Sequence, residues 1–272
     1  MIHNQKVGVG IVTYNRKEGL LKLVNSLPLN LIDEIIIVND GEHFSDYDNF
    51  SFHYHHNEEN MGVGVSKNIA LRYLQSRKVE HYFLIEDDVF IKNPDVFFRY
   101  IEASEVSGIQ HFNFSQHGVH NIDEQGKPNP RLRVNYEGLD VMLFPSCVGA
   151  FCYYTAQCLD TAGLMDECFY NAMEHVDHTI SIIDCGMHPP FSYFADIENS
   201  QDYIGDEVWS HQQSTINKGL NYNGLLIAAL KKFYRKRGYS VSDIVLATPK
   251  AVQMQLVEIQ KKYAVANPVC AI

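Results

Sequence analysis

The segment KVGVGIVTYNRKEGLLKLVNSL, residues 6–27, decides the fold that the sequence predicts. Residues 6–12 are apolar enough for a buried strand, and residues 17–27 carry leucine and valine at helical spacing. Residues 34–39, EIIIVN, form a second apolar run, which is typical of parallel strands covered on both faces. A strand, a helix and a further strand form the repeating unit of α/β folds.

The same alternation continues along the chain. We expect a more exposed strand at 51–56, a helix at 64–77 and a strand at 81–85. This order predicts an α/β fold with a doubly wound, mixed sheet flanked by helices. Residues 111–135, rich in Gly, Pro, Asn and His, predict a long loop or hairpin that covers the site. Further helices are predicted at 155–163, 173–184, 222–236 and 249–263.

Length and composition fit one such domain with a helical C-terminal extension. The chain has 272 residues, of which 46% are hydrophobic. Its net charge of −11 argues against a nucleic-acid partner, because phosphate contacts need a basic face. We find no signal peptide and no apolar run near the ~18 residues of a membrane span. We therefore expect a cytoplasmic protein, with at most peripheral contact at the inner face of the membrane. The six cysteines include no Cys-x-x-Cys pair and are expected to be reduced.

Polar clusters follow three of the predicted strands. They are Thr13-Tyr14-Asn15-Arg16, Asn39-Asp40 and Glu86-Asp87-Asp88. In open α/β sheets, ligands bind beyond the carboxyl ends of the strands. We therefore expect the three clusters to meet at one rim of the sheet and to form a ligand site.

The acidic cluster after residue 85 suggests a metal site. Three consecutive carboxylates repel one another unless a cation joins them, and Mg²⁺ or Mn²⁺ prefers carboxylate oxygens. Such an ion would neutralise the charge that builds up on a departing nucleoside diphosphate. A solvated acidic turn is the alternative interpretation. In NMGVGVSKN, Asn60, Gly62 and Lys67 lie near a helix start, where backbone N–H groups can face an anion.

Taken in order, these segments resemble the GT-A glycosyltransferases, especially the inverting family 2, over roughly residues 6–240. LIEDDVF lies where that family has Asp-x-Asp, so that Glu86 replaces the first Asp and Asp88 takes the metal-binding position. Asp40 lies where the family contacts the nucleotide base. The donor-binding residues that the resemblance implies are Thr13, Tyr14, Asn15, Arg16, Asp40, Asn60, Gly62, Lys67, Glu86 and Asp87.

The most specific match is CVGAFCYYTAQCLDTAGLMDECFYNAMEHVDHTISI, residues 147–182. The family has there a Gly-Ala-Phe segment, then Gly-x-x-Asp-Glu, then an acidic pair on a helix. The resemblance implies that Glu174 is the carboxylate that accepts the proton of the acceptor hydroxyl, with Asp177 in reserve. His175 follows Glu174 at a position where the family usually has an acid. Acidic residues that merely stabilise a helix N-terminus are the alternative.

The resemblance also suggests a further metal ligand far along the chain. His188, Asp196 and His211 are the candidates, and nothing in their spacing chooses among them. His53, His55 and His56 lie on the exposed strand and are expected at the surface. Trp209 and the basic run at 231–237 are consistent with contact to a sugar or an anion, and equally with packing or a solvated helix face.

The resemblance therefore implies a metal-dependent glycosyltransferase that uses Mn²⁺ or Mg²⁺ and a nucleotide-sugar donor, with UDP as the commonest base. Its acceptor would be a saccharide, a lipid-linked glycan or a protein, in polysaccharide or glycoconjugate synthesis. We expect a GT-A domain at 1–220, with a nucleotide half at 1–110 and an acceptor half at 111–220, and an extension at 221–272.

Three alternatives stay open at the level of the sequence. A sugar nucleotidyltransferase shares the α/β plan, but it usually opens with a Gly-rich loop where this chain has TYNRKEG. A degenerate domain that only binds a glycan or a partner would tolerate the changes at Glu86 and His175. A retaining mechanism is also compatible, because a fold does not fix the chemistry.

Overall fold

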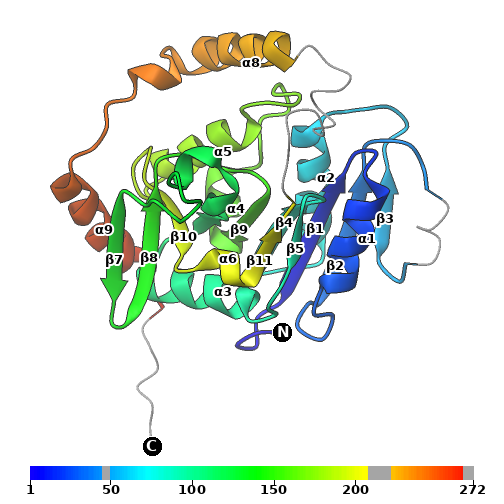
Figure 1. Cartoon of the computed structure of the whole chain (residues 1–272), viewed down its shortest axis with the longest axis horizontal. Helices are drawn as coiled ribbons and strands as arrows, with labels where there is room; N and C mark the ends of the chain where they lie inside the picture. The colour runs from blue at the N-terminus through cyan, green and yellow to red at the C-terminus, as the bar shows by residue number, and fades with distance from the viewer. Residues whose placement is uncertain (45–49, 208–221, 266–272) are drawn as a thin grey trace, which may run out of the picture.

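A computed structural model describes residues 1–44, 50–207 and 222–265. In these residues, a six-stranded mixed sheet is flanked by helices, as the sequence predicts (Figure 1). Its strands, in spatial order, are β3 (His53–His56), β2 (Glu34–Asn39), β1 (Val7–Thr13), β4 (His81–Glu86), β9 (Phe151–Thr155) and β6 (His111–Asn113). The first four run parallel to one another, and β9 runs antiparallel to both β4 and β6.

The centre of this sheet is apolar on both faces. Every residue of β1 is buried, as are all but the first residue of β2 and all but the last of β4. Helix α2 (Val63–Ser76) packs closely on β1, because Gly10 leaves room for it. A Cβ atom at Gly10 would lie 2.8 Å from the Cβ of Ala70. The unbroken hydrophobic runs and the glycines in β1 thus have one cause, which is helix cover on the sheet.

The remaining predicted helices are also present. They are α1 (Lys17–Ser26), α4 (Ala156–Ala162), α5 (Glu174–Asp184), α8 (Tyr222–Arg237) and α9 (Pro249–Tyr263). Helix α3 (Val96–Ser107) was not predicted, and α9 packs against it. The described part of the chain contains no helix both long enough and apolar enough to cross a bilayer. Its five cysteines are all free thiols.

The segment at 111–135 has more structure than a loop. It contains β6, the short 3₁₀ turns η2 (Ser115–His117) and η3 (Val119–Asn121), and most of β7 (Leu132–Tyr136). Strand β7 forms a hairpin with β8 (Leu139–Phe144), and β8 pairs on its other side with β10 (Phe194–Ile197). A short ladder joins β5 (Val89–Ile91) to β11 (Ile204–Asp206), which follows the one-turn helix α6 (Ser200–Tyr203). The pairing of β10 with β8 and that of β11 with β5 bring residues of the C-terminal half of the chain close to the site.

Buried neutral histidines give the fold a pH-dependent stability. His178 is buried in α5, its Nε2 donates to the carbonyl oxygen of Gly163, and burial lowers its pKa from 6.5 to about 4. Between pH 6.5 and about pH 4, His178 is protonated in the unfolded chain but stays neutral in the folded chain. The free energy of unfolding therefore falls as the pH drops through this window.

We predict that replacing His178 with Gln weakens this dependence. Between about pH 7 and about pH 5, the variant should lose about 2 kcal/mol less free energy of unfolding than the native chain, measured by urea titration at both pH values. Replacing the exposed His120 should leave the dependence as it is. Equal losses in the native chain and the His178→Gln variant would contradict the assignment.

Candidate active site at the carboxyl ends of the parallel strands

The three polar clusters lie at one rim of the sheet. Strands β2, β1 and β4 are neighbours, with Thr13 beside Asn39 and Val12 beside Glu86 in the register of the sheet. The segments that follow these strands therefore leave the sheet at the same level. The expectation that they meet at one edge is confirmed by the pairing.

Asp87 is held by the last residue of β1 and by the segment that follows it. Its Oδ2 accepts a hydrogen bond of 2.6 Å from the hydroxyl of Thr13, and its Oδ1 lies 3.0 Å from Nη1 of Arg16. Burial raises the pKa of Asp87 to about 7, against the opposing effect of Arg16. The second nitrogen of the guanidinium, Nη2, lies 2.7 Å from Glu207. Arg16 therefore joins two acidic segments that are far apart in the sequence.

Asp88 faces two residues from outside the clusters. The pairing of β11 with β5 sets Asp206 opposite Val89, next to Asp88. His117 in η2 lies between the two carboxylates, with its Nδ1 3.0 Å from Asp206 and its Nε2 3.8 Å from Asp88. Although burial opposes it, the contact with Asp206 and the charge of Asp88 raise the pKa of His117 to about 9. Burial and Glu86 raise the pKa of Asp88 to about 6.

The side chains at this position fit a loosely held divalent cation. The Oδ1 atom of Asp88 is buried and has no hydrogen-bond partner among the described residues. In the same residues, no three His, Cys, Asp or Glu side chains form a ready metal cluster. Mg²⁺ and Mn²⁺ often need only one or two protein carboxylates, because substrate phosphates and water complete their coordination. Asp88, with Asp206 beside it, is a donor set of that kind.

Lys67 joins the acidic cluster to helix α5. Its buried Nζ lies 2.6 Å from Oε1 of Glu86, 3.3 Å from Oε1 of Glu174 and 3.2 Å from the carbonyl oxygen of Gly149. Burial alone would lower its pKa, but the two carboxylates outweigh burial and raise it. The lysine expected at the diphosphate is therefore a buried counter-ion with its charge already neutralised.

Glu174 lies at the start of α5 and is nearly closed off from solvent. Its side chain is 4% exposed, and its Oε1 also lies 3.0 Å from Nδ1 of His175. Burial would raise its pKa, but His175 and Lys67 together lower it. The side chain of His175 is 23% exposed and is the more accessible of the two. Glu174 therefore stays ionised, which makes it a weak proton acceptor.

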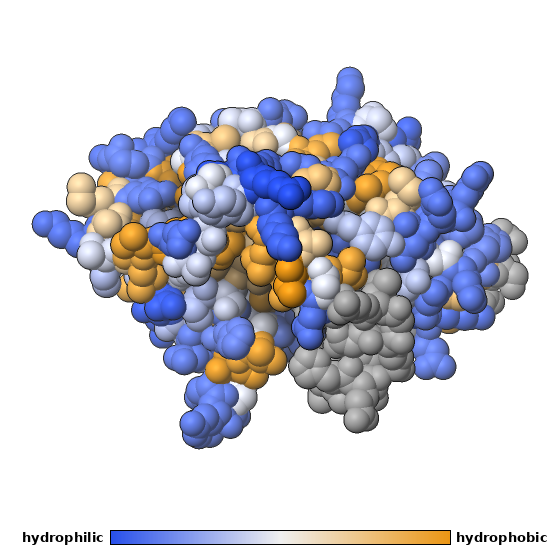
Figure 2. Space-filling model, turned by 90° about the horizontal axis from the view of Figure 1, so that it is seen from above, coloured by the Kyte–Doolittle hydropathy of each residue, from blue (hydrophilic) through white to orange (hydrophobic). Residues whose placement is uncertain are grey.

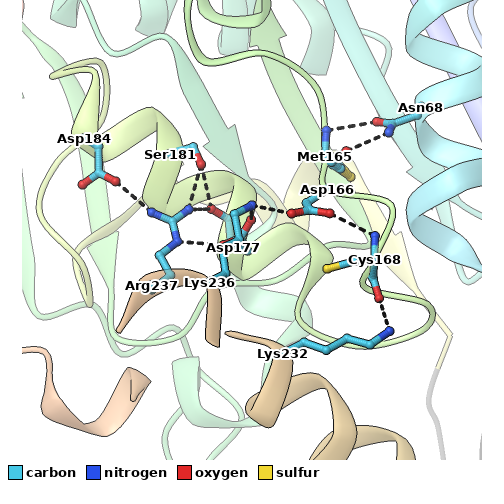
Figure 3. A network of polar contacts seen from close by, with 10 residues as sticks. All are labelled: Asn68, Met165, Asp166, Cys168, Asp177, Ser181, Asp184, Lys232, Lys236 and Arg237. Carbon is cyan, nitrogen blue, oxygen red and sulfur yellow. Dashed lines mark hydrogen bonds and ion pairs between the residues drawn. The ribbon is translucent and has the colours of Figure 1, made fainter. Parts of the chain in front are cut away.

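Asp177, the reserve base, is neutralised by helix α8. Its Oδ2 lies 2.7 Å from Nζ of Lys236, and its Oδ1 lies 2.8 Å from Nε of Arg237 (Figure 3). Arg237 also donates to the carbonyl oxygen of Asp177 and to the hydroxyl of Ser181, and it pairs with Asp184. The side chain of Asp177 is 1% exposed. This arrangement argues for a structural carboxylate and against a proton acceptor.

Asp40 organises the loop before α2. Its two oxygens accept hydrogen bonds of 2.7–2.8 Å from Nδ2 of Asn57 and from the backbone N–H groups of Met61 and Gly62. The carboxylate thus fills the anion position that the glycine segment was expected to offer to a diphosphate. Asn60 accepts from the Gly62 N–H through its side chain.

Tyr14 and Asn15 complete the rim. Tyr14 is 36% exposed and is one of the large side chains at this edge of the sheet that are open to solvent. Asn15 adopts a left-handed conformation, and its Oδ1 accepts from the N–H of Glu42 at 2.6 Å. Asn15 therefore fixes the turn after β1 against the turn after β2.

The candidates for a distant metal ligand have other partners. Asp196 is fully buried and accepts from the hydroxyls of Tyr100 and Ser200 and from the N–H of Ser115, at 2.6–2.9 Å. It anchors the turn that carries His117. His188 is buried, and its ring bonds to the backbone of Pro189 and Ala195. Neither side chain has a free oxygen or nitrogen for a metal in this arrangement. His211 and Trp209 lie outside the described residues.

The sequence did not single out His117, Asp206 or Glu207. His117 lies in the histidine-rich segment that was expected to cover the site, so that composition was its only signal. Asp206 and Glu207 reach the site through the pairing of two three-residue strands, which have no periodicity to read.

Comparisons with known proteins agree with the fold. Residues 8–105 match the family model of Glycosyl transferase family 2. No curated protein matches the chain significantly. Among solved structures, TarS of S. aureus is similar with a TM-score of 0.50 and 14% identity, over 94% of this chain and 48% of TarS. GalNAc-T7 with UDP, GalNAc and Mn²⁺ is similar with a TM-score of 0.56 and 12% identity. The likeness covers 97% of this chain and 56% of the GalNAc-T7 chain.

A third similar structure is the mannosyltransferase PcManGT from Pyrobaculum calidifontis with GDP-Man and Mn²⁺. It has a TM-score of 0.54 and 13% identity, over 93% of this chain and 69% of that one. The chain thus spans about half the length of the TarS and GalNAc-T7 structures. The resemblance to family 2 is confirmed over the matched residues, and the GT-A fold over nearly the whole chain. The family match and these structural likenesses are all to glycosyltransferases.

The contacts of Asp177 lead to a stability prediction. Replacing Arg237 with Ala removes one cation from a buried carboxylate, and breaking such a pair typically costs about 3 kcal/mol or more. We expect a loss of about 3 kcal/mol in the free energy of unfolding, measured by guanidinium titration, because Lys236 remains beside Asp177. Replacing Lys261, which forms an exposed pair with Glu258, should change it by less than about 0.5 kcal/mol. Similar losses in the two variants would contradict the role given to Asp177.

Proposed function

We propose that this GT-A chain is a metal-dependent glycosyltransferase that moves a sugar from a nucleoside-diphosphate donor to an acceptor hydroxyl with inversion. One observation carries the proposal. The ends of three adjacent parallel strands bring Thr13, Arg16 and the acidic cluster together, and within that group Asp88 keeps a buried oxygen without a partner. A cation that brings phosphate oxygens with it would satisfy that oxygen.

The donor would lie along the rim. In this proposal the nucleoside lies against Tyr14 and the turns that Asn15 and Asp40 fix, and the diphosphate points toward Asp88. A divalent ion held there would neutralise the negative charge of the leaving diphosphate. Arg16, which pairs with the neighbouring Asp87, would also lie near that charge. Lys67 and Gly62 support the shape of the site and would not contact the donor directly.

UDP-sugars are our first choice of donor. Two of the similar structures contain UDP or GDP-Man, each with Mn²⁺, so that both bases need testing. The acceptor would be a saccharide, a lipid-linked glycan or a protein, in polysaccharide or glycoconjugate synthesis. A nucleic-acid acceptor is disfavoured by the net charge of −11.

We also propose a cytoplasmic location with peripheral membrane contact through α8. This helix exposes Ile227, Leu230 and Tyr234 and ends in basic residues. Figure 2 looks onto the side of the molecule where α8 lies and shows hydrophobic patches among hydrophilic residues. Such a mixture is typical of helices that rest on a bilayer surface.

The donor site can be tested by calorimetry. We predict that UDP, or else one of GDP, CDP and dTDP, binds with Mn²⁺ and that binding weakens strongly without the ion. Replacing Asp88 with Asn should lower the affinity in Mn²⁺ by about 100-fold, because the ion loses its buried oxygen. Replacing Asp95, an exposed aspartate at the start of α3, should leave the affinity unchanged.

The other outcomes decide between the alternatives. Binding of UTP and a sugar 1-phosphate with formation of pyrophosphate would favour a sugar nucleotidyltransferase. If none of the four diphosphates binds with or without Mn²⁺, the site does not hold a donor, and the chain is a non-catalytic domain that binds a glycan or a partner.

A further inference from the structure

The residue after Glu174 has the geometry of a general base. Both residues lie in the first turn of α5, and Nδ1 of His175 lies 3.0 Å from Oε1 of Glu174. A bond to an ionised carboxylate requires the hydrogen on Nδ1, which leaves the lone pair on Nε2. Among the described residues, Nε2 of His175 has no hydrogen-bond partner. The pair is therefore an oriented imidazole backed by a buried carboxylate.

Gly149 fixes which edge of the ring is open. A Cβ atom at Gly149 would lie 3.1 Å from both Cγ and Nδ1 of His175, and 3.1 Å from Nζ of Lys67. The backbone of Gly149 thus covers the edge that carries Nδ1. Gly149 makes no such close approach to the edge that carries Nε2, and 23% of the His175 side chain is exposed.

The neighbouring candidates are less suited to accept a proton. Glu174 is 4% exposed and paired with Lys67, and both neighbours lower its pKa. Asp177 is neutralised by α8. His178 is buried and donates its Nε2 hydrogen to the carbonyl oxygen of Gly163. His111 is buried against Tyr154, with its two ring nitrogens directed at Tyr153 and Thr179.

His175 is also linked to the donor rim. Nζ of Lys67 lies 2.6 Å from Glu86, two residues before Asp88, and 3.3 Å from Glu174 on the other side. One buried cation thus joins the end of β4 to the turn that holds the imidazole. This places His175 beside the acidic cluster on which the proposed leaving group would lie.

We propose that His175 is the catalytic base of the transfer and that Glu174 is its positioning residue, a proposal that rests on the proposed glycosyltransferase function. The acceptor hydroxyl gives its proton to Nε2 of His175 while its oxygen forms a bond to the anomeric carbon. The bond from that carbon to the diphosphate oxygen breaks, and the electron pair leaves with the nucleoside diphosphate. His175 becomes an imidazolium that Glu174 stabilises, and it returns its proton to solvent.

The acid limb of the pH profile gives a signature of this role. An imidazolium cannot accept a second proton, so that activity falls as the pH drops. Glu174→Gln removes the carboxylate that orients the imidazole and should lower the release rate, while the affinity for the diphosphate stays the same. The groups that face this pair stay the same in every variant of His175. They are Lys67, His111 and Cys147.

The experiment compares His175→Asn and His175→Asp with the native chain. The probes are UDP-glucose, UDP-GlcNAc and GDP-mannose with Mn²⁺, and water takes the place of the acceptor. The first readout is the rate at which UDP or GDP is released. The second is the affinity for the same diphosphate, measured by calorimetry. Asn keeps a donor for Glu174 but is no base. We expect release to fall about 100-fold or more, with diphosphate affinity within about twofold and no acid limb.

His175→Asp restores a base of lower intrinsic pKa. It should recover at least about tenfold of the lost rate, with the acid limb displaced to lower pH. The control is His53→Asn, at the far end of β3 from the rim, which should release at the native rate. Native release by His175→Asn, with unchanged diphosphate binding, would overturn the assignment of the base and leave the glycosyltransferase standing. A native chain that binds none of UDP, GDP, CDP and dTDP, with or without Mn²⁺, would overturn the function itself.

Discussion

The site depends on one buried ammonium group. Lys67 lies in α2 between Glu86 at the end of β4 and Glu174 at the start of α5, and no part of it reaches solvent. An isolated charge in that position would be strongly unfavourable, and so would either carboxylate without it. The three side chains are therefore stable only together. Because each comes from a different element, the ion pairs fix the distance between the donor rim and helix α5. Gly149 is part of the same constraint, because its carbonyl oxygen accepts from the ammonium and a Cβ atom there would displace it.

The other carboxylates of the site differ in whether the chain itself supplies their cations or hydrogen-bond donors. Asp87 faces Arg16, Asp177 faces Lys236 and Arg237, and Asp40 takes backbone N–H groups. Each of these is complete within the chain. Asp88 differs, because the cation that pairs with it among the described residues, His117, lies 3.8 Å away and is shared with Asp206. One oxygen of Asp88 has no hydrogen-bond partner in the same residues. In a protein with a net charge of −11, such a group is the natural place for an external cation.

Most of the parallel part of the sheet could be predicted from the sequence, because parallel strands covered on both faces leave uninterrupted apolar runs at 7–13, 34–39 and 81–86. The rim followed from the same runs, since parallel neighbours end at the same edge. The antiparallel insertion of β9 and the short ladder of β5 with β11 could not be predicted, because pairing partners distant in sequence leave no local pattern. For the same reason the place of Asp206 in the site could not be predicted. Lys67 was read as a phosphate ligand, because a sequence gives the type of a charged side chain but not which counter-ions surround it.

Helix α8 lies outside the rim but helps to fix the position of helix α5 in the site. Asp177 is one turn along α5 from Glu174, and its buried charge requires cations that neither α5 nor the central sheet provides. Lys236 and Arg237 provide them from the last turn of α8, and Arg237 continues to Ser181 and Asp184 further along α5 (Figure 3). The helical extension is thus part of the support of the helix that carries Glu174 and His175. An orientation of the imidazole accurate enough for proton transfer needs α5 held at both ends. Lys67 holds its start, and the basic end of α8 holds its middle and its last turn.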